Sequence, residues 1–289
     1  QRRCERVLGV RLMSDFLDRR ELGNTGLRSS RLGIGSSFGV SARVIEEAFD
    51  RGINYLYWGS IRRAEFGRAM RNLGRRHRDE LILTVQSYSR LPAMIGASVE
   101  VALRRAGLEY FDFLLLGARN EAPPEAYIEA FERLKEQGKV RFLSLSSHNR
   151  PLVPQLIGDE APYDLYMVRY NAVHRGAERD VFAHLPEQPR AGIVAYTATR
   201  WGHLLDARKM PPGETPVSAS DCYRFALSHP SVDLVLCGPA NAAQMDEAIS
   251  ALEGGPLVDN ERARIEQIGD YVYGKHQPKF ADAGDARKG

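Results

Sequence analysis

The fold is decided by the run Phe111-Asp112-Phe113-Leu114-Leu115-Leu116, whose last four residues are apolar without interruption. A strand with one face in solvent alternates apolar and polar residues, whereas a continuous apolar run is typical of a strand buried on both faces. Parallel strands covered by helices are buried in this way. The run therefore predicts an α/β protein and excludes most sandwich architectures.

Seven further short runs of apolar, β-branched or aromatic residues accompany this one, and amphipathic segments lie between most of them. The eight runs occupy residues 31–36, 53–58, 81–86, 111–116, 140–145, 165–169, 192–196 and 234–237. In the connections, Val44, Ala48 and Phe49 mark one apolar helix face, and Gly52 and Gly138 are typical helix C-terminal stops. Eight strands alternating with helices predict a single (β/α)8 TIM barrel, which is an α/β fold.

The predicted barrel occupies residues 19–274, and a chain of 289 residues needs no second domain. We assign no role to residues 1–18 and expect them to form a flexible arm. Residues 275–289 carry few apolar groups and cannot bury enough surface to offset the entropy of ordering. We expect them to form a flexible tail.

Composition narrows the class of partner and the compartment. A formal net charge of +3, with 27% charged residues, is too near balance to favour nucleic acid or a membrane as partner. The three cysteines show no CxxC or Cys/His spacing, so we expect neither a disulfide framework nor a metal site, and a cytoplasmic location fits best. No apolar run approaches the roughly 18 residues of a membrane span, and we expect no signal peptide.

Polar residues gather directly after the predicted strands, where barrel enzymes place their chemistry. These segments, which give the mouth a cationic and aromatic character, are residues 57–63, 86–90, 119–120, 146–149, 169–171, 197–201 and 239–244. Arg62 and Arg63 could clamp an anion, although solvated loop arginines are equally common. His148 is the histidine directly beyond a strand end, where it could donate a proton or make a structural hydrogen bond.

Several segments match one known family in order and spacing, from about residue 20 to about residue 273. They are residues 21–27 with 32–35, 48–54, 138–141, 169–171, 194–197 and 238–241 with Gln244. Through them the chain resembles an aldo-keto reductase. In this resemblance the Gly23-Asn24-Thr25-Gly26 turn corresponds to an N-terminal β-hairpin that plugs the bottom of the barrel.

The resemblance implies a non-standard active site. Members of this family reduce a carbonyl with an Asp, Tyr, Lys and His tetrad. Here the matching positions carry Tyr57 for Asp, Arg62 for Tyr, Gln86 for Lys and Gly117 for His. Our candidate catalytic residues are Tyr57, Arg62, Gln86 and His148, and Tyr88 is a further phenol near the strand ends.

The cofactor implied by the resemblance is NADP(H), with NAD(H) or no nicotinamide cofactor as alternatives. Tyr196 matches the residue that stacks on the nicotinamide, and Ser146 matches a carboxamide ligand, whereas Ser147 and Met167 replace the family's Asn and Gln. The remaining candidates are Thr197, Thr199 and Arg200 around the pyrophosphate, and Gly238, Asn241, Gln244 and Glu247 around the adenosine.

Two classes of function stay open at this point. One is an NADP(H)-dependent oxidoreductase acting on a small carbonyl compound, whose charge could be negative because of Arg62, Arg63, Arg119 and Arg169. The other is a barrel that binds a nucleotide or metabolite without turnover, as a sensor or an accessory subunit. No feature of the sequence indicates the oligomeric state.

Overall fold

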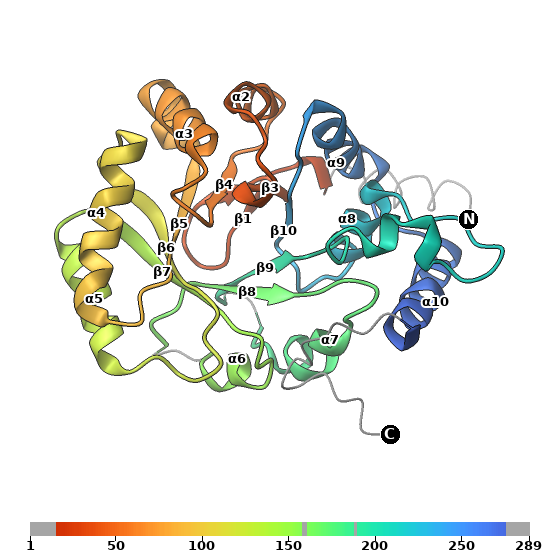
Figure 1. Ribbon diagram of the computed structural model, residues 1–289. Helices are drawn as coiled ribbons and strands as arrows, with labels where there is room; N and C mark the ends of the chain where they lie inside the picture. Colours follow the sequence, from red (N-terminus) through yellow and green to blue (C-terminus); the bar gives the residue numbers. More distant parts are fainter. Residues whose placement is uncertain (1–15, 158–160, 188–189, 276–289) are drawn as a thin grey trace, which may run out of the picture.

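The computed structural model describes residues 16–157, 161–187 and 190–275, and in them eight parallel strands close into a barrel (Figure 1). Neighbouring strands follow the order β10-β3-β4-β5-β6-β7-β8-β9. They are β3 (Leu32–Gly35), β4 (Tyr55–Trp58), β5 (Ile82–Ser87), β6 (Phe111–Leu116), β7 (Val140–Ser146), β8 (Leu165–Arg169), β9 (Gly192–Tyr196) and β10 (Leu234–Cys237). The predicted (β/α)8 barrel is confirmed, with strand ends close to the predicted ones.

Helices surround the barrel on its outside (Figure 1). They are α2 (Ala42–Asp50), α3 (Ala64–His77), α4 (Ile95–Ala106), α5 (Glu125–Glu136), α6 (Leu152–Gln155), α7 (Gly176–Asp180), α8 (Ala219–Leu227), α9 (Ala242–Gly254) and α10 (Asp259–Lys275). Ser41 caps α2 by accepting a hydrogen bond from Val44 N. Gly52 and Gly138, at φ 98° and 68°, adopt the left-handed conformation that suits glycine after a helix, as predicted.

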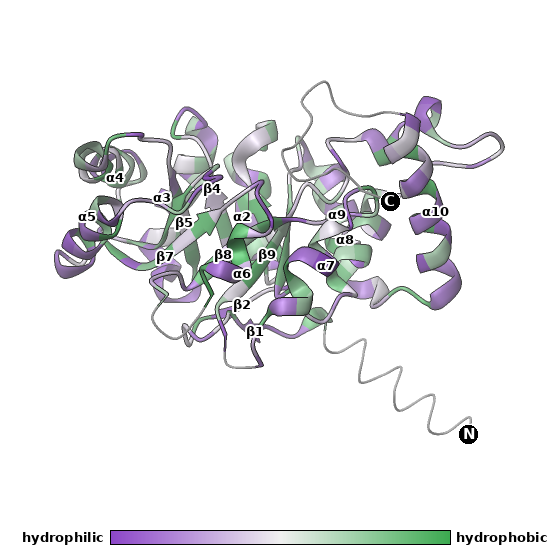
Figure 2. Cartoon of the chain, turned by 90° about the horizontal axis from the view of Figure 1, so that it is seen from below, coloured by the Kyte–Doolittle hydropathy of each residue, from purple (hydrophilic) through white to green (hydrophobic). Residues whose placement is uncertain are grey.

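The core has two parts, one inside the barrel and one between strands and helices. All six residues of β6 are buried. Phe113 and Leu115 belong to the cluster inside the barrel, whereas Leu114 and Leu116 belong to the outer cluster. Figure 2 shows the green, hydrophobic strands within a shell of helices that carry purple, hydrophilic stretches. Burial on both faces is the reason for the uninterrupted apolar run.

An antiparallel hairpin closes one end of the barrel, as Figure 2 shows for β1 (Arg20–Glu21) and β2 (Arg28–Ser29). Leu22, which is 1% exposed, packs in the cluster inside the barrel. Gly23 has φ 61°, and a Cβ atom there would overlap the backbone nitrogen of Gly192. The predicted plug is therefore present, and Gly23 is needed for its close approach to β9.

One carboxylate, that of Asp112, is buried where β5, β6 and β7 meet. It accepts hydrogen bonds from Leu83 N at 2.8 Å, Arg78 Nη2 at 3.0 Å and Arg141 Nη1 at 3.1 Å. A buried charge is costly unless it is paired and hydrogen-bonded. The two guanidinium groups and the amide satisfy this condition.

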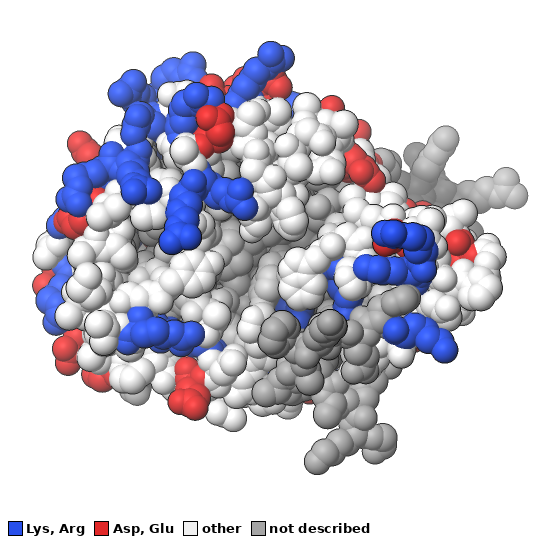
Figure 3. All heavy atoms as spheres, viewed as in Figure 1, with Lys and Arg blue, Asp and Glu red and all other residues white. Residues whose placement is uncertain are grey.

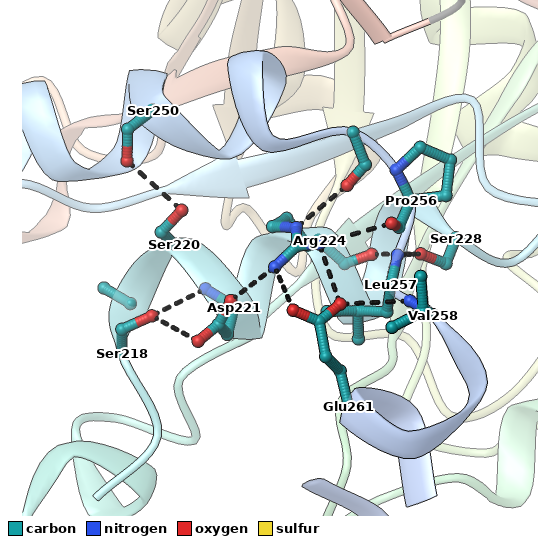
Figure 4. A network of polar contacts seen from close by, with 12 residues as sticks. Ser218, Ser220, Asp221, Arg224, Ser228, Ser250, Pro256, Leu257, Val258 and Glu261 are labelled. Carbon is teal, nitrogen blue, oxygen red and sulfur yellow. Dashed lines mark hydrogen bonds and ion pairs between the residues drawn. The ribbon is translucent and has the colours of Figure 1, made fainter. Parts of the chain in front are cut away.

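The last helices are joined by a network around Arg224 of α8 (Figure 4). Its guanidinium donates to Asp221 Oδ1 at 2.8 Å, to Glu261 Oε2 at 2.9 Å, and to the carbonyl oxygens of Gly255 at 2.9 Å and Pro256 at 3.2 Å. The fork of donors on one arginine thus fixes α8 against the loop between α9 and α10. This matters for function because the same helix contributes a wall of the cavity described below.

Most of the predicted arm and tail, residues 1–15 and 276–289, lies outside the described residues. Phe16 is 3% exposed and packs beneath the guanidinium of Arg31, whose Cζ lies 5.2 Å from the ring centroid. The packed part of the chain therefore starts before residue 19, because this cation–π contact anchors Phe16. Among the described helices, none is long and apolar enough to span a membrane.

Candidate active site

A cavity of about 580 Å³ opens at the carboxyl ends of the strands. Strand-end residues from around the barrel line it, among them Gly35 of β3, Tyr57 of β4, Gln86 of β5, Tyr196 of β9 and Cys237 of β10. Figure 3 shows the centre of this face hollowed between side chains. Both the position and the volume are typical of a ligand site in a barrel enzyme.

Tyr57 and Gln86 form a polar pair in the wall of the cavity. The Tyr57 hydroxyl donates a hydrogen bond to Gln86 Oε1. Burial raises the pKa of the Tyr57 phenol well above its usual value, and the neighbouring Tyr88 and Tyr55 raise it further. The phenol is therefore protonated at neutral pH, with its proton directed toward the amide.

Gln86 occupies the space above Gly117. A Cβ atom on Gly117 would overlap Gln86 Nε2 and lie 2.5 Å from Gln86 Cδ. The end of β6 thus accommodates this amide because residue 117 has no side chain. Within the described part of the chain, Gln86 Nε2 donates no hydrogen bond, so its N–H groups are available to a molecule in the cavity.

Tyr196 and His148 lie side by side on the same cavity. Tyr196 OH and His148 Nδ1 are 3.4 Å apart, and the ring centroids are separated by 6.4 Å in an edge-on arrangement. Both residues line the cavity, and Tyr196 is partly exposed. The pair supplies an aromatic surface with polar groups at its edge, as a flat heteroaromatic ligand requires.

The loop after β9 is strained. Thr197, Arg200 and Trp201 have φ values of 58°, 49° and 53°, a left-handed conformation that residues other than glycine seldom adopt. Asn171 Nδ2 donates to Thr197 O at 2.8 Å and helps to hold the loop in place. Such strain persists only where surrounding contacts enforce it, and it concentrates at binding sites.

Comparison with known proteins assigns the chain to a family. A model of the Aldo/keto reductase family matches residues 31–221, which is well over half of the chain. The chain belongs to the aldo/keto reductase family. It is 23% identical to L-galactose dehydrogenase of Arabidopsis thaliana, over 82% of this chain and 88% of the relative. It is 25% identical to L-glyceraldehyde 3-phosphate reductase of Escherichia coli strain K12, over 86% and 91%.

A solved aldo/keto reductase from Klebsiella pneumoniae, in complex with NADP and acetate, has the same fold. The TM-score is 0.72 at 20% identity, and the match covers 93% of this chain and 99% of that chain. The family resemblance drawn from the sequence is thereby confirmed, as is the barrel fold.

In this aldo/keto reductase the candidate catalytic residues fall into two groups. Tyr57, Gln86 and His148 line the main cavity together. Arg62 does not line it and lies instead on an adjoining side cavity with Arg63. Among the described residues of the main lining there is no lysine and no aspartate.

Most of the candidate cofactor residues line the main cavity. They are Ser146, Met167, Tyr196, Thr197, Thr199, Gly238, Gln244 and Glu247. Several of these groups are partly engaged: Ser146 Oγ accepts from Ala118 N at 2.9 Å, Gln244 Oε1 from Ala240 N at 2.8 Å, and Glu247 Oε1 from Ala219 N at 2.9 Å. These contacts orient the side chains and leave Gln244 Nε2 for a ligand.

Three candidate cofactor residues are not in the lining. Ser147 Oγ is bonded to the backbone of Asn149, and Asn241 caps α9 by accepting from Gln244 N at 3.0 Å. Arg200 is 1% exposed, and its guanidinium lies 3.2 Å from His174 Nε2 and 2.6 Å from His203 Nδ1. A contact between Arg200 and a pyrophosphate would require the guanidinium to leave these imidazoles.

The expected cationic mouth is smaller than the sequence suggested, because Arg119 and Arg169 are buried and do not line the cavity. Arg119 Nη2 donates to Ser89 O at 2.6 Å, and its guanidinium lies 4.3 Å from the ring centroid of Tyr127, which indicates a structural role.

The cavity also contains the thiol of Cys237. Burial raises the pKa of this thiol to about 12, so it is neutral at pH 7.

Two apolar side chains of the cavity had been given no role. Phe38 and Trp201 are 55% and 51% exposed and stand at its edge. A Cβ atom on Gly238 would lie 2.6 Å from the ring of Phe38, so this ring covers the end of β10. Phe38 follows closely after the first predicted strand, residues 31–36, so its position at a strand end is the signal in the sequence that points to it.

Proposed function

We propose that this aldo/keto reductase transfers a hydride between a nicotinamide cofactor and a small carbonyl compound, with NADP(H) preferred to NAD(H). One observation carries the proposal: a single cavity joins the candidate cofactor residues to the Tyr57–Gln86 pair. The names of the two relatives denote oxidoreductases of small hydroxylated compounds. The buried free thiols Cys222 and Cys237 suit a reducing compartment, and we place the protein in the cytoplasm.

The residues present fit such a cofactor. Tyr196 offers an aromatic surface for the nicotinamide, Ser146 a hydroxyl for its carboxamide, and Gln244 with Glu247 a polar end for the adenosine. When bound in its reduced form, the nicotinamide supplies the hydride. The Klebsiella pneumoniae structure of the same fold was solved with NADP, which supports this choice.

Tyr57 and Gln86 would act on the carbonyl oxygen. The free N–H groups of Gln86 Nε2 can donate to this oxygen and stabilise the negative charge that develops on it. The protonated Tyr57 can then supply the proton that completes the alcohol, and solvent returns a proton to the phenolate. In the reverse direction the Tyr57 phenolate, formed by loss of its proton to solvent, would accept the proton from an alcohol.

A second candidate is a barrel that binds the nucleotide or a metabolite without turnover. It is favoured by the raised pKa of Tyr57, because a phenol in apolar surroundings is a weak acid. Among the described residues that line the cavity, no lysine is available to lower that pKa. This second candidate function retains cofactor binding and lacks only the reduction of a carbonyl.

Calorimetric titration with NADPH, NADH and their oxidised forms tests the cofactor. We expect micromolar binding of one nucleotide, and Tyr196→Ala should weaken it at least tenfold through loss of about 1.5 kcal/mol of ring contact. Tyr271→Ala, a change on α10 outside the cavity lining, is the matched control. An absence of heat with all four nucleotides would reject the proposal.

Turnover then separates the two candidates. Reduction of small aldehydes by the wild-type protein, lost in Tyr57→Phe with an unchanged nucleotide Kd, would assign the proton to Tyr57. Nucleotide binding without turnover of any aldehyde would favour the binding protein. Full activity of Tyr57→Phe would remove the assigned role of this phenol.

A further inference from the structure

A second, smaller cavity of about 300 Å³ adjoins the main one. Both cavities are lined by Ser37, Tyr57 and Tyr88, so the two spaces share a wall. The rest of the side cavity is formed by Ser36, Gly59, Ser60, Arg62 and Arg63. The reactive end of the main cavity therefore adjoins a pocket lined by hydroxyl and guanidinium groups.

The side cavity is positively charged and its charge is not compensated. No Asp or Glu occurs among the described residues of its lining. The Arg62 guanidinium makes no hydrogen bond or ion pair within the described ranges, and Arg63 uses only Nη2, which donates to Ser37 O at 2.6 Å. Figure 3 shows Lys and Arg side chains gathered beside the central hollow on the side of α3.

The loop that carries these arginines is held in place from three sides. Trp58 Nε1 donates to Arg63 O at 3.2 Å, Arg105 Nη1 donates to Ile61 O at 3.1 Å, and Gly59 N donates to Ser36 Oγ at 3.1 Å. A loop that is already fixed loses less conformational entropy when it binds a ligand than a flexible loop does. The positive end of the α3 dipole, which starts at Ala64, adds to the local potential.

An ordinary solvated arginine of the same region looks different. Arg68 on α3 forms an ion pair with Glu65, and its side chain points to a charge that balances it. Among the described residues Arg62 has no such partner, and it lines a concave space together with three serines. Planar guanidinium groups beside hydroxyls in a cavity are the arrangement that binds carboxylate and phosphate oxygens.

We infer that this side cavity binds an oxyanion of the substrate, a carboxylate or a phosphate, while the carbonyl of the same molecule reaches the Tyr57–Gln86 pair. The inference rests on the proposed function for the identity of the reacting group. Because Tyr57 lines both cavities, we expect a short molecule to reach from one to the other. The substrate class is thus a short-chain aldehyde or ketone with an acidic group at its other end.

Two matched pairs of aldehydes test the inference, with 4-oxobutanoate against butanal for the carboxylate and glyceraldehyde 3-phosphate against glyceraldehyde for the phosphate. We expect kcat/KM to favour at least one anionic member, and Arg62→Gln or Arg63→Gln to lower that value about 10- to 100-fold, as loss of a charge-assisted hydrogen bond does. The neutral members should change less than about threefold. Arg68→Gln, outside both cavity linings, is the control.

The outcomes separate the site from the reaction. Equal use of neutral and anionic aldehydes, with the same ratio in Arg62→Gln, overturns the oxyanion site and leaves the reductase proposal intact. If no aldehyde is reduced, calorimetric titration of the wild-type protein and Arg62→Gln with inorganic phosphate and with succinate replaces the kinetic test. Binding to the wild-type protein alone supports the oxyanion site without the reaction, and no binding to either overturns it.

Discussion

Replacement of Gly117 by alanine should disable the reaction centre without replacing any group that takes part in it. The added Cβ atom would lie 2.5 Å from Gln86 Cδ and overlap Nε2, so the amide must move by at least about 1 Å to reach an ordinary contact distance. The backbone at residue 117 is not in the left-handed region, so alanine adds no backbone strain. The whole effect therefore falls on Gln86.

The cost follows from the two interactions that Gln86 would lose. The hydrogen bond from Tyr57 is worth about 0.5–1.5 kcal/mol, and a donor to a developing oxyanion is worth about 2.7–4 kcal/mol. We therefore expect kcat to fall about 10²- to 10⁴-fold. Global stability should change by less than about 1 kcal/mol, because the clash involves only the end of a flexible side chain.

A double-mutant cycle provides the assay. Gly117→Ala, Gln86→Ala and the double variant are compared for kcat with the best aldehyde, for nucleotide Kd and for unfolding midpoint. In the Gln86→Ala background there is nothing left for the new methyl group to displace, so Gly117→Ala should then cost less than about threefold. Additive losses, or an unchanged kcat in Gly117→Ala alone, would refute the coupling.

Four further outcomes follow from the structure. Asp112→Ala should lower the free energy of unfolding by about 3–5 kcal/mol in a denaturant titration, because it leaves the largely buried Arg78 and the buried amide of Leu83 without their acceptor. The exposed Asp246→Ala should cost under about 1 kcal/mol, and similar costs for the two variants would contradict this. Arg224→Ala should cost about 2–4 kcal/mol, and Arg224→Lys should recover only part of it because an ammonium cannot bond to every acceptor in Figure 4. Nucleotide binding should change the fluorescence of Trp201 at the cavity edge, and Trp201→Phe should abolish the signal while calorimetric heat persists. The pKa of Tyr57 is raised in the fold, so the folded chain holds this proton more tightly than the unfolded chain does. The contribution of this group to the free energy of unfolding should therefore be constant from about pH 7 to 9 and decline above about pH 10. A decline that begins near pH 8 would point to another group.

The fold could be predicted because its determinants are local or periodic. The apolar run of β6, the spacing of eight such runs and the glycines after α2 and α5 are each visible in the sequence alone. The plug, by contrast, was implied by the family resemblance of the Gly23-Asn24-Thr25-Gly26 turn and not by a local rule. The packing of Phe16 could not be predicted, because Phe16 contacts Arg31, a residue fifteen positions away whose orientation no local pattern reveals.

The candidate site was predictable only in part. Residues at strand ends were located correctly as a class, and Tyr57, Gln86 and Tyr196 do share one cavity. The direction of an arginine side chain was not predictable, because Arg119 is drawn inward by a carbonyl and an aromatic ring that come from distant segments. The position of a residue after a strand determines where its backbone lies, whereas its tertiary contacts determine the direction in which its charged group points.

Gln86 and Gly117 show why a comparison with the family's tetrad, made one position at a time, exaggerates the loss of catalytic groups. The family resemblance assigns these positions two separate departures, a missing lysine and a missing histidine. In space the two positions are neighbours: residue 117 has no side chain, and the Gln86 amide from the adjacent strand lies where one would be. Within the described residues the Nε2 group of this amide donates no hydrogen bond. A carbonyl reduction needs a donor at the oxygen and a protonated acid within reach, and Gln86 and Tyr57 can meet both needs from β5 and β4. The replaced tetrad positions that the resemblance implies are thus compatible with the rearranged centre that we propose.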